Sequence, residues 1–127
     1  MIGERPWLLI VDGDLELSST LAEVFRIQGY WARVCNRGEE ALSLLLDGLT
    51  PNLMLLDMHV AGLDGWELAH ELRRAGIVVR TLVMTADDNP AVCAEQVGAA
   101  GYLAKPFGPT ELFRQVESLL ASPPHAA

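Results

Sequence analysis

Short apolar runs recur along the chain, and each ends in a polar residue or a turn. Their starts lie 22 to 26 residues apart, and nearly continuous apolar character is typical of strands that are buried on both faces. The runs cover residues 7–11, 30–35, 52–56, 78–84 and 101–104. The pattern therefore predicts five strands, of which 78–84 is the least regular because a polar pair interrupts it.

Segments with helical periodicity separate these runs. In the first segment, Leu17, Leu21, Val24 and Phe25 fall on one face, and Gly29 ends the helix. The corresponding apolar sets of three later helices are Ala41, Leu42, Leu45 and Leu46; Trp66, Ala69 and Leu72; and Leu112, Val116, Leu119 and Leu120. Residues 90–97 form the weakest expected helix, because this segment is short and rich in small residues.

Alternating strands and helices at this spacing predict right-handed βαβ units. The expected fold class is α/β, a doubly wound (βα)5 flavodoxin-like fold. Its five-stranded parallel sheet has the order 2-1-3-4-5, with helices on both faces. A closed barrel would need eight strands. We assign residues 1–121 to one domain and residues 122–127 to a flexible C-terminal tail.

Composition narrows the possible functions. The chain has 127 residues, is half hydrophobic and carries a formal net charge of −8, which is typical of a globular domain but disfavours binding to nucleic acid. Two cysteines are too few for a disulfide framework. No apolar run is long enough to cross a bilayer, and the first residues do not resemble a signal peptide. We therefore expect a cytoplasmic protein without membrane contact.

Polar residues follow four of the five expected strands. Asp12 follows the first strand, Asp57 the third, Thr85 the fourth, and Lys105 with Pro106 the fifth. The carboxyl ends of parallel strands meet at one edge of a sheet, where ligands bind. Carboxylates beside a single ammonium favour Mg²⁺, and such a site predicts transfer of a phosphoryl group onto Asp57.

Five motifs occur in order over nearly the whole chain. They are Leu-Ile-Val-Asp at 9–12, Leu-Leu-Asp at 55–57, Gly-Leu-Asp-Gly at 62–65, Val-Met-Thr-Ala at 83–86 and Gly-Tyr-Leu-Ala-Lys-Pro-Phe at 101–107. With these motifs the chain resembles a response-regulator receiver domain of the chemotaxis-regulator type, a component of two-component signalling.

The resemblance implies roles for the residues at the strand ends. Asp57 would be the phosphoacceptor, which receives the phosphoryl group from a sensor histidine kinase or a phosphotransfer protein. Lys105 would pair with the phosphoryl group, and Thr85 would be the switch hydroxyl that closes over it. Tyr102 would be the aromatic switch residue that turns inward when Thr85 moves.

A metal ion and a cis peptide are implied in the same way. Mg²⁺ would be held by Asp12, Asp57 and the backbone carbonyl of His59. The bond between Lys105 and Pro106 would be cis, a conformation that is largely confined to bonds before proline.

The resemblance also implies how the signal leaves the domain. A downstream protein would bind the face formed by the fourth helix, the fifth strand and the fifth helix, and a homodimer through this face stays open. We expect a stand-alone receiver that contacts neither nucleic acid nor membrane. It would be a signalling domain rather than an enzyme, with at most slow self-dephosphorylation.

The sequence departs from the family pattern beside the expected metal. Receivers usually carry two successive acids after the first strand, whereas here Gly13 follows Asp12. Asp14 then has three possible roles. It can cap the following helix while Mg²⁺ binding is weakened, which we favour. It can reach the metal through the flexible glycine, or Asp12 alone remains and the metal binds weakly or not at all.

Three further positions differ or stand out near Asp57. Ala61 replaces the usual proline before Gly62. His59 and Asp87 lie two residues beyond Asp57 and Thr85, where the family controls access of water to the phosphoryl group. We expect His59 to be a solvated loop histidine.

Two alternative functions remain open. Gly13 and Ala61 are also consistent with a pseudo-receiver, a protein-interaction module that no longer needs Mg²⁺ or phosphate. The segment Ile-Val-Asp-Gly-Asp at 10–14 resembles the nucleophile motif of haloacid-dehalogenase-like phosphatases, although Asp57 would then have no role.

Overall fold

A computed structural model describes residues 5–121 of the chain. Five strands are present: β1 (Trp7–Val11), β2 (Trp31–Cys35), β3 (Leu53–Asp57), β4 (Thr81–Thr85) and β5 (Gly101–Ala104). Five helices alternate with them: α1 (Leu15–Ile27), α2 (Gly38–Leu46), α3 (Gly65–Arg74), α4 (Pro90–Val97) and α5 (Pro109–Ala121). The predicted tail, residues 122–127, lies outside the described residues.

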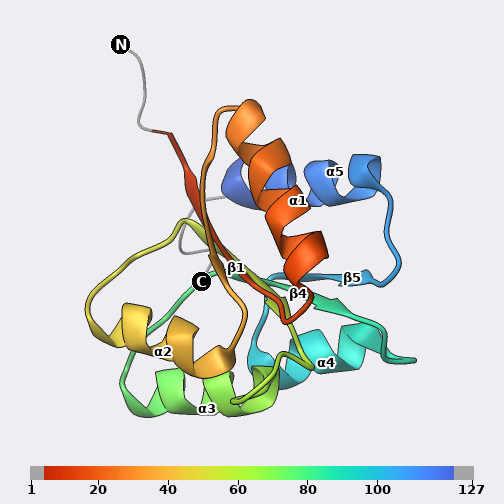
Figure 1. Ribbon diagram of the computed structural model, residues 1–127. Coiled ribbons are helices and arrows are strands. Elements are labelled where there is room, and N and C mark those ends of the chain that lie inside the picture. Colours follow the sequence, from red (N-terminus) through yellow and green to blue (C-terminus); the bar gives the residue numbers. More distant parts are fainter. Residues whose placement is uncertain (1–4, 122–127) are drawn as a thin grey trace.

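The strands form one parallel sheet in the order β2-β1-β3-β4-β5. Helices α1 and α5 cover one face, and α2, α3 and α4 cover the other (Figure 1). The predicted fold class, strand order and two-sided helical layers are therefore confirmed. None of the described helices is long and apolar enough to cross a membrane.

Alternating side chains of the central strands divide the core between the two layers. Leu9 and Val11 pack under α2 and α3, whereas Leu8 and Ile10 pack under α1 and α5. All four side chains are fully buried, because both faces of the sheet are covered. This double coverage makes β1 and β3 rigid supports for the residues at their carboxyl ends.

Two details differ from the sequence prediction. The fourth strand begins at Thr81 rather than at position 78, and Val78 is 90% exposed. The register explains this difference, because Thr81 pairs with Met54 and β3 begins at Leu53, so residues 78 and 79 precede the start of the neighbouring strand. The pattern predicts Leu46 on the buried face of the second helix, but Leu46 is 54% exposed, whereas Ala41 and Leu45 are buried.

Candidate functional site

The carboxyl ends of β1, β3, β4 and β5 bring the expected residues to one edge of the sheet. Asp57 ends β3 and Thr85 ends β4, while Asp12 and Lys105 directly follow β1 and β5. The Lys105 Nζ atom lies 2.8 Å from Asp12 Oδ2 and 3.6 Å from Asp57 Oδ2. We call this group of Asp12, Asp57, Thr85 and Lys105 the acidic pocket.

Asp12 is fully buried and fully hydrogen-bonded. Its Oδ2 atom accepts from Lys105, and its Oδ1 atom accepts from the Asp14 amide at 2.9 Å. Its backbone carbonyl accepts from Asn36 Nδ2 at 2.7 Å, and its amide donates to Cys35. Burial of a carboxylate is costly unless a counter-charge and hydrogen bonds replace water, and here both are present. Asp12 is therefore held in one orientation.

Asp57 is the more accessible and less neutralised of the two carboxylates. Its Oδ1 atom accepts a hydrogen bond from the His59 amide at 3.1 Å. Burial nevertheless raises the pKa of Asp57 above its ordinary value, and this effect outweighs the hydrogen bond and the charge of Lys105. The distances explain the balance, since Lys105 lies closer to Asp12 than to Asp57. Lys105 therefore lies within ion-pair distance of Asp57 but contacts Asp12 more closely.

Thr85 and Lys105 are joined through their backbones. The Lys105 amide donates to the Thr85 carbonyl at 2.8 Å, and the bond between Lys105 and Pro106 is cis. The Thr85 side chain is fully buried, and its Oγ1 atom accepts from the Asp87 amide at 3.1 Å. Tyr102 lies on β5 and is 45% exposed, so its inward turn stays a prediction.

A second group of polar side chains borders the acidic pocket. His59 Nε2 lies 2.8 Å from Asp87 Oδ1, and the Cys93 thiol donates to Asp87 Oδ2 at 3.3 Å. The hydrogen bond from His59 lowers the pKa of Asp87. His59 is exposed, as expected, but it is not simply solvated, because Asp87 pairs with it. Its ring also meets the Trp66 ring edge-on, with centroids 5.5 Å apart.

The Asp14 side chain caps α1. Its Oδ1 atom accepts from the Leu17 amide at 3.0 Å, so the N-cap role that we favoured is confirmed. A Cβ atom added to Gly13 would lie 3.6 Å from the Ala61 nitrogen and 3.7 Å from the Asn36 carbonyl oxygen, which are ordinary contact distances. The backbone at position 13 therefore has room for a Cβ atom, which glycine lacks.

The loop that contains Ala61 is tied to its neighbour. A parallel β-bridge pairs Arg37 with Ala61, and the Gly38 amide donates to the Ala61 carbonyl at 3.0 Å. The carbonyl of Ala61 thus connects the loop after β3 to the start of α2, although alanine stands where the family usually has proline.

The donor atoms fit a magnesium ion, with fewer acids than usual. Receiver domains usually bind Mg²⁺ at this position, and Mg²⁺ accepts one or two carboxylates with water in its other positions. Asp12 and Asp57 would supply those carboxylates. Among residues 5–121 there is no group of three or more His, Cys, Asp or Glu side chains that could hold a metal. The role of the His59 carbonyl as a third protein ligand stays a prediction.

Sequence reasoning missed Asn36 and Ser18. Asn36 Nδ2 donates to both the Asp12 carbonyl and Ser18 Oγ, which links β1, α1 and the end of β2. Asn36 directly follows β2. The rule applied to the other four strand ends would have found it, whereas the buried Ser18 has no comparable signal in the sequence.

Comparison with known proteins identifies the family. Residues 8–117 match the response regulator receiver domain, so the chain belongs to this family, which acts in two-component systems. This assignment replaces the interpretation as a haloacid-dehalogenase-like phosphatase.

Curated relatives are about twice as long as this chain. The "DNA-binding response regulator MtrA" of Mycobacterium tuberculosis is 33% identical over 91% of this chain and 51% of its own length. The "Response regulator SaeR" of Staphylococcus aureus is 30% identical over 89% of this chain and 50% of its own length. The chain thus spans about half of these relatives, one of which is named for DNA binding. Stand-alone action and the absence of nucleic-acid contact both stay predictions here.

Solved structures share the same fold. The receiver domain of Francisella response regulator 1452 superposes with a TM-score of 0.82 and 28% identity, over 91% of this chain and 97% of that chain. Response regulator TrrA of Thermotoga maritima, solved in complex with Mg²⁺ and BeF, gives a TM-score of 0.78 and 28% identity, over 91% and 99% of the two chains.

Proposed function

We propose that this domain receives a phosphoryl group on Asp57 from a phosphohistidine of a sensor histidine kinase or a phosphotransfer protein. The observation that carries the proposal is the position of Lys105, whose ammonium lies 2.8 Å from Asp12 and 3.6 Å from Asp57. That position holds a fixed positive charge beside the carboxylate that would react. Membership of the receiver family supports the same assignment.

The chemical step is a displacement at phosphorus. A carboxylate oxygen of Asp57 attacks the phosphorus atom, the P–N bond to the donor histidine breaks, and its electron pair stays on the imidazole, which then takes a proton. An acyl phosphate results. Lys105 is placed to neutralise the added phosphoryl oxygens, and Thr85 can donate its hydroxyl to one of them after it moves toward them. Mg²⁺ held by Asp12 and Asp57 would supply further positive charge when bound.

The product would act as a signal rather than as a turnover intermediate. We propose that a protein partner reads the state of Asp57 on the face formed by α4, β5 and α5, where Tyr102 lies exposed. The domain would have no small-molecule turnover beyond slow loss of its own phosphoryl group.

A second candidate function has one observation in its favour. Beside the expected metal, Gly13 stands where receivers usually carry a second acid. The Asp14 carboxylate cannot replace it freely, because it caps α1. A pseudo-receiver that binds its partner without Mg²⁺ or phosphate would have the same features.

One experiment separates the two functions. The chain is incubated with acetyl phosphate and increasing Mg²⁺, and intact mass is followed, with Asp57→Asn as the variant without a phosphoacceptor. We expect a mass increase of one phosphoryl group in the wild type and none in the variant. A wild-type chain that forms no adduct at any Mg²⁺ concentration contradicts the proposal and favours the pseudo-receiver.

A further inference from the structure

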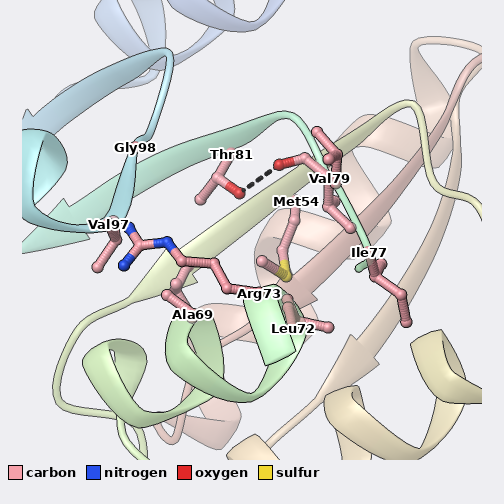
Figure 2. A pocket seen from close by; sticks show the side chains of 11 residues that line it. Met54, Ala69, Leu72, Arg73, Ile77, Val79, Thr81, Val97 and Gly98 are labelled. Atoms are coloured by element: carbon pink, nitrogen blue, oxygen red, sulfur yellow. Dashed lines mark hydrogen bonds between the residues drawn. The ribbon is translucent and has the colours of Figure 1, made fainter. Parts of the chain in front are cut away.

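An apolar cavity of about 190 Å³ lies at the other end of the sheet, where β3 and β4 begin (Figure 2). Helices α3 and α4 close its sides. Its interior is formed by apolar side chains, among them Met54, Leu56, Leu72 and Val97. Met54, Leu56 and Leu72 are at most 5% exposed, whereas Val78 at the rim is 90% exposed, so the cavity opens to solvent above a floor of core side chains.

Arg73 is the charged residue that lines this cavity. Figure 2 shows its side chain extending from α3 toward Val97. Its Nη2 atom donates to the Gln96 carbonyl at 3.0 Å. Arg73 is exposed. Within residues 5–121, Arg37 and Arg74 form ion pairs with glutamates, whereas Arg73 forms none. In a chain of net charge −8, a guanidinium without an anion beside an apolar cavity favours an anionic ligand.

We propose that this cavity binds a small apolar carboxylic acid as its anion. The apolar group would lie between Met54, Leu72 and Val97, and the carboxylate would pair with Arg73 at the rim. The volume limits the ligand, since a cavity of about 150 Å³ is known to hold benzene, and about 190 Å³ admits a single ring or a short branched chain. The proposal is independent of phosphorylation at Asp57.

Position and chemistry distinguish this cavity from the acidic pocket. The acidic pocket has carboxylates at the carboxyl edge of the sheet, whereas no acidic residue lines the cavity. The cavity has an apolar floor, and its remaining polar side chain is Thr81, whose hydroxyl donates to the Val79 carbonyl at 2.9 Å. A neutral amide of the same shape would fill the floor equally well but would lack the ionic contact with Arg73.

The test is a titration of the ¹⁵N-labelled full chain followed by NMR, with benzoate and the matched amide benzamide as probes. We expect saturable shifts at the amides of Leu72, Thr81 and Val97. The expected dissociation constant for benzoate is about 0.1–1 mM, which lies within the bounds on affinity per atom for a ligand of about nine non-hydrogen atoms. Benzamide should bind at least about tenfold more weakly, because it cannot form the charge-assisted pair.

Two arginine variants decide the role of charge. In Arg73→Met the apolar stem remains, and we expect benzoate to bind no better than benzamide. Arg74→Met is the matched control, because Arg74 is the next residue on α3, has a 69% exposed side chain and pairs with Glu71. It should bind benzoate like the wild type. Equal benzoate affinity in Arg73→Met and wild type overturns the proposal.

A cavity-filling variant tests the location. Ala69 lines the cavity from α3, and Ala69→Leu should abolish binding of both probes while the spectrum stays dispersed and folded. If this variant unfolds, the shift map of the wild type decides instead. Absence of saturable shifts at Leu72, Thr81 and Val97 with millimolar benzoate contradicts the proposal.

Discussion

The two sides of the acidic pocket differ in how firmly they are built. On the lysine side, buried Asp12 accepts from Lys105, and Lys105 is also joined to Thr85 through its backbone. On the metal side, Gly13 has no side chain, and the Asp14 carboxylate is directed to the start of α1. The side that would contact phosphoryl oxygens is complete, whereas the side that would hold a cation lacks one acid.

This difference separates two requirements of the same reaction. A phosphoryl group needs both a nucleophile with a fixed cation and a counter-charge from a metal. Here the cation Lys105 follows β5, whereas Gly13 and Asp14 follow β1. A loss on the metal side can therefore weaken Mg²⁺ binding without disturbing the Lys105–Asp12 pair. The following substitutions test whether the two sides are independent.

Removal of the lysine should have the largest effect on stability. Lys105→Met leaves Asp12 fully buried without its cation, and loss of one partner of a buried pair costs several kcal/mol. Because the Lys105 side chain is 20% exposed, we expect a loss of about 2–3 kcal/mol in the free energy of unfolding, measured with urea. The double variant Asp12→Asn with Lys105→Met should recover part of this loss. A change below about 0.5 kcal/mol for Lys105→Met would show that the pair is not a structural element.

An acid at position 13 should strengthen the binding of Mg²⁺. A side chain at position 13 begins at ordinary contact distances, so Gly13→Asp should fold and add a carboxylate beside Asp12. We expect Mg²⁺ to bind at least about tenfold more tightly, a gain of about 1.4 kcal/mol. Trp66 fluorescence is the readout, since its ring lies 5.5 Å from the His59 ring. Gly13→Asn is the uncharged control, and equal affinity in Gly13→Asp and wild type would contradict the account of the missing acid.

Asp14 should matter for the helix and not for the metal. Asp14→Ala removes the acceptor for the Leu17 amide and should lower the free energy of unfolding by about 1 kcal/mol. Asp14→Ser keeps a cap but not the charge, so its stability and its Mg²⁺ affinity should both stay close to those of the wild type. A weaker Mg²⁺ affinity in Asp14→Ser would instead make Asp14 a direct ligand.

The smallest expected effect is a pH-dependent gain in the stability of the fold when the charge of Asp57 is removed. Burial raises the pKa of Asp57 in the folded state above its ordinary value of 3.8. The ionised group therefore destabilises the fold above the folded-state pKa, and this cost disappears as the pH falls toward 3.8. Without Mg²⁺, Asp57→Asn should raise Tm by about 2–5 °C at pH 7, and the gain should shrink toward pH 4. The exposed Asp88→Asn is the control, and a lower Tm for Asp57→Asn at pH 7 would contradict this sign.

The convergence of the residues at the strand ends was predictable from the sequence, because the carboxyl ends of parallel strands all lie at one edge of the sheet. Once the apolar runs were assigned, Asp12, Asp57, Thr85 and Lys105 had to fall at the same edge, and the structure brings them there. The helix cap at Asp14 was predictable for a different reason, because it is a local contact between residues three positions apart.

Contacts between distant elements were not predictable in this way. The hydrogen bonds of Asp87 to His59 and Cys93 depend on how the loop after β3 and helix α4 pack against each other. The cavity beside Arg73 likewise depends on the gap left between α3, α4 and the start of β4. No periodicity within one segment encodes such spacing between segments.

The ion pair between Asp12 and Lys105 joins residues 93 positions apart, and this separation has a consequence for folding kinetics. Contacts between distant residues form late, because closure of a long loop costs chain entropy before the contact can offset it. Lys105 is the chain's only lysine, so until β5 joins the sheet the carboxylates of Asp12 and Asp57 have no ammonium side chain beside them. A partly folded chain would thus be a poor phosphoryl acceptor, and competence to receive the signal would report that the whole sheet has assembled.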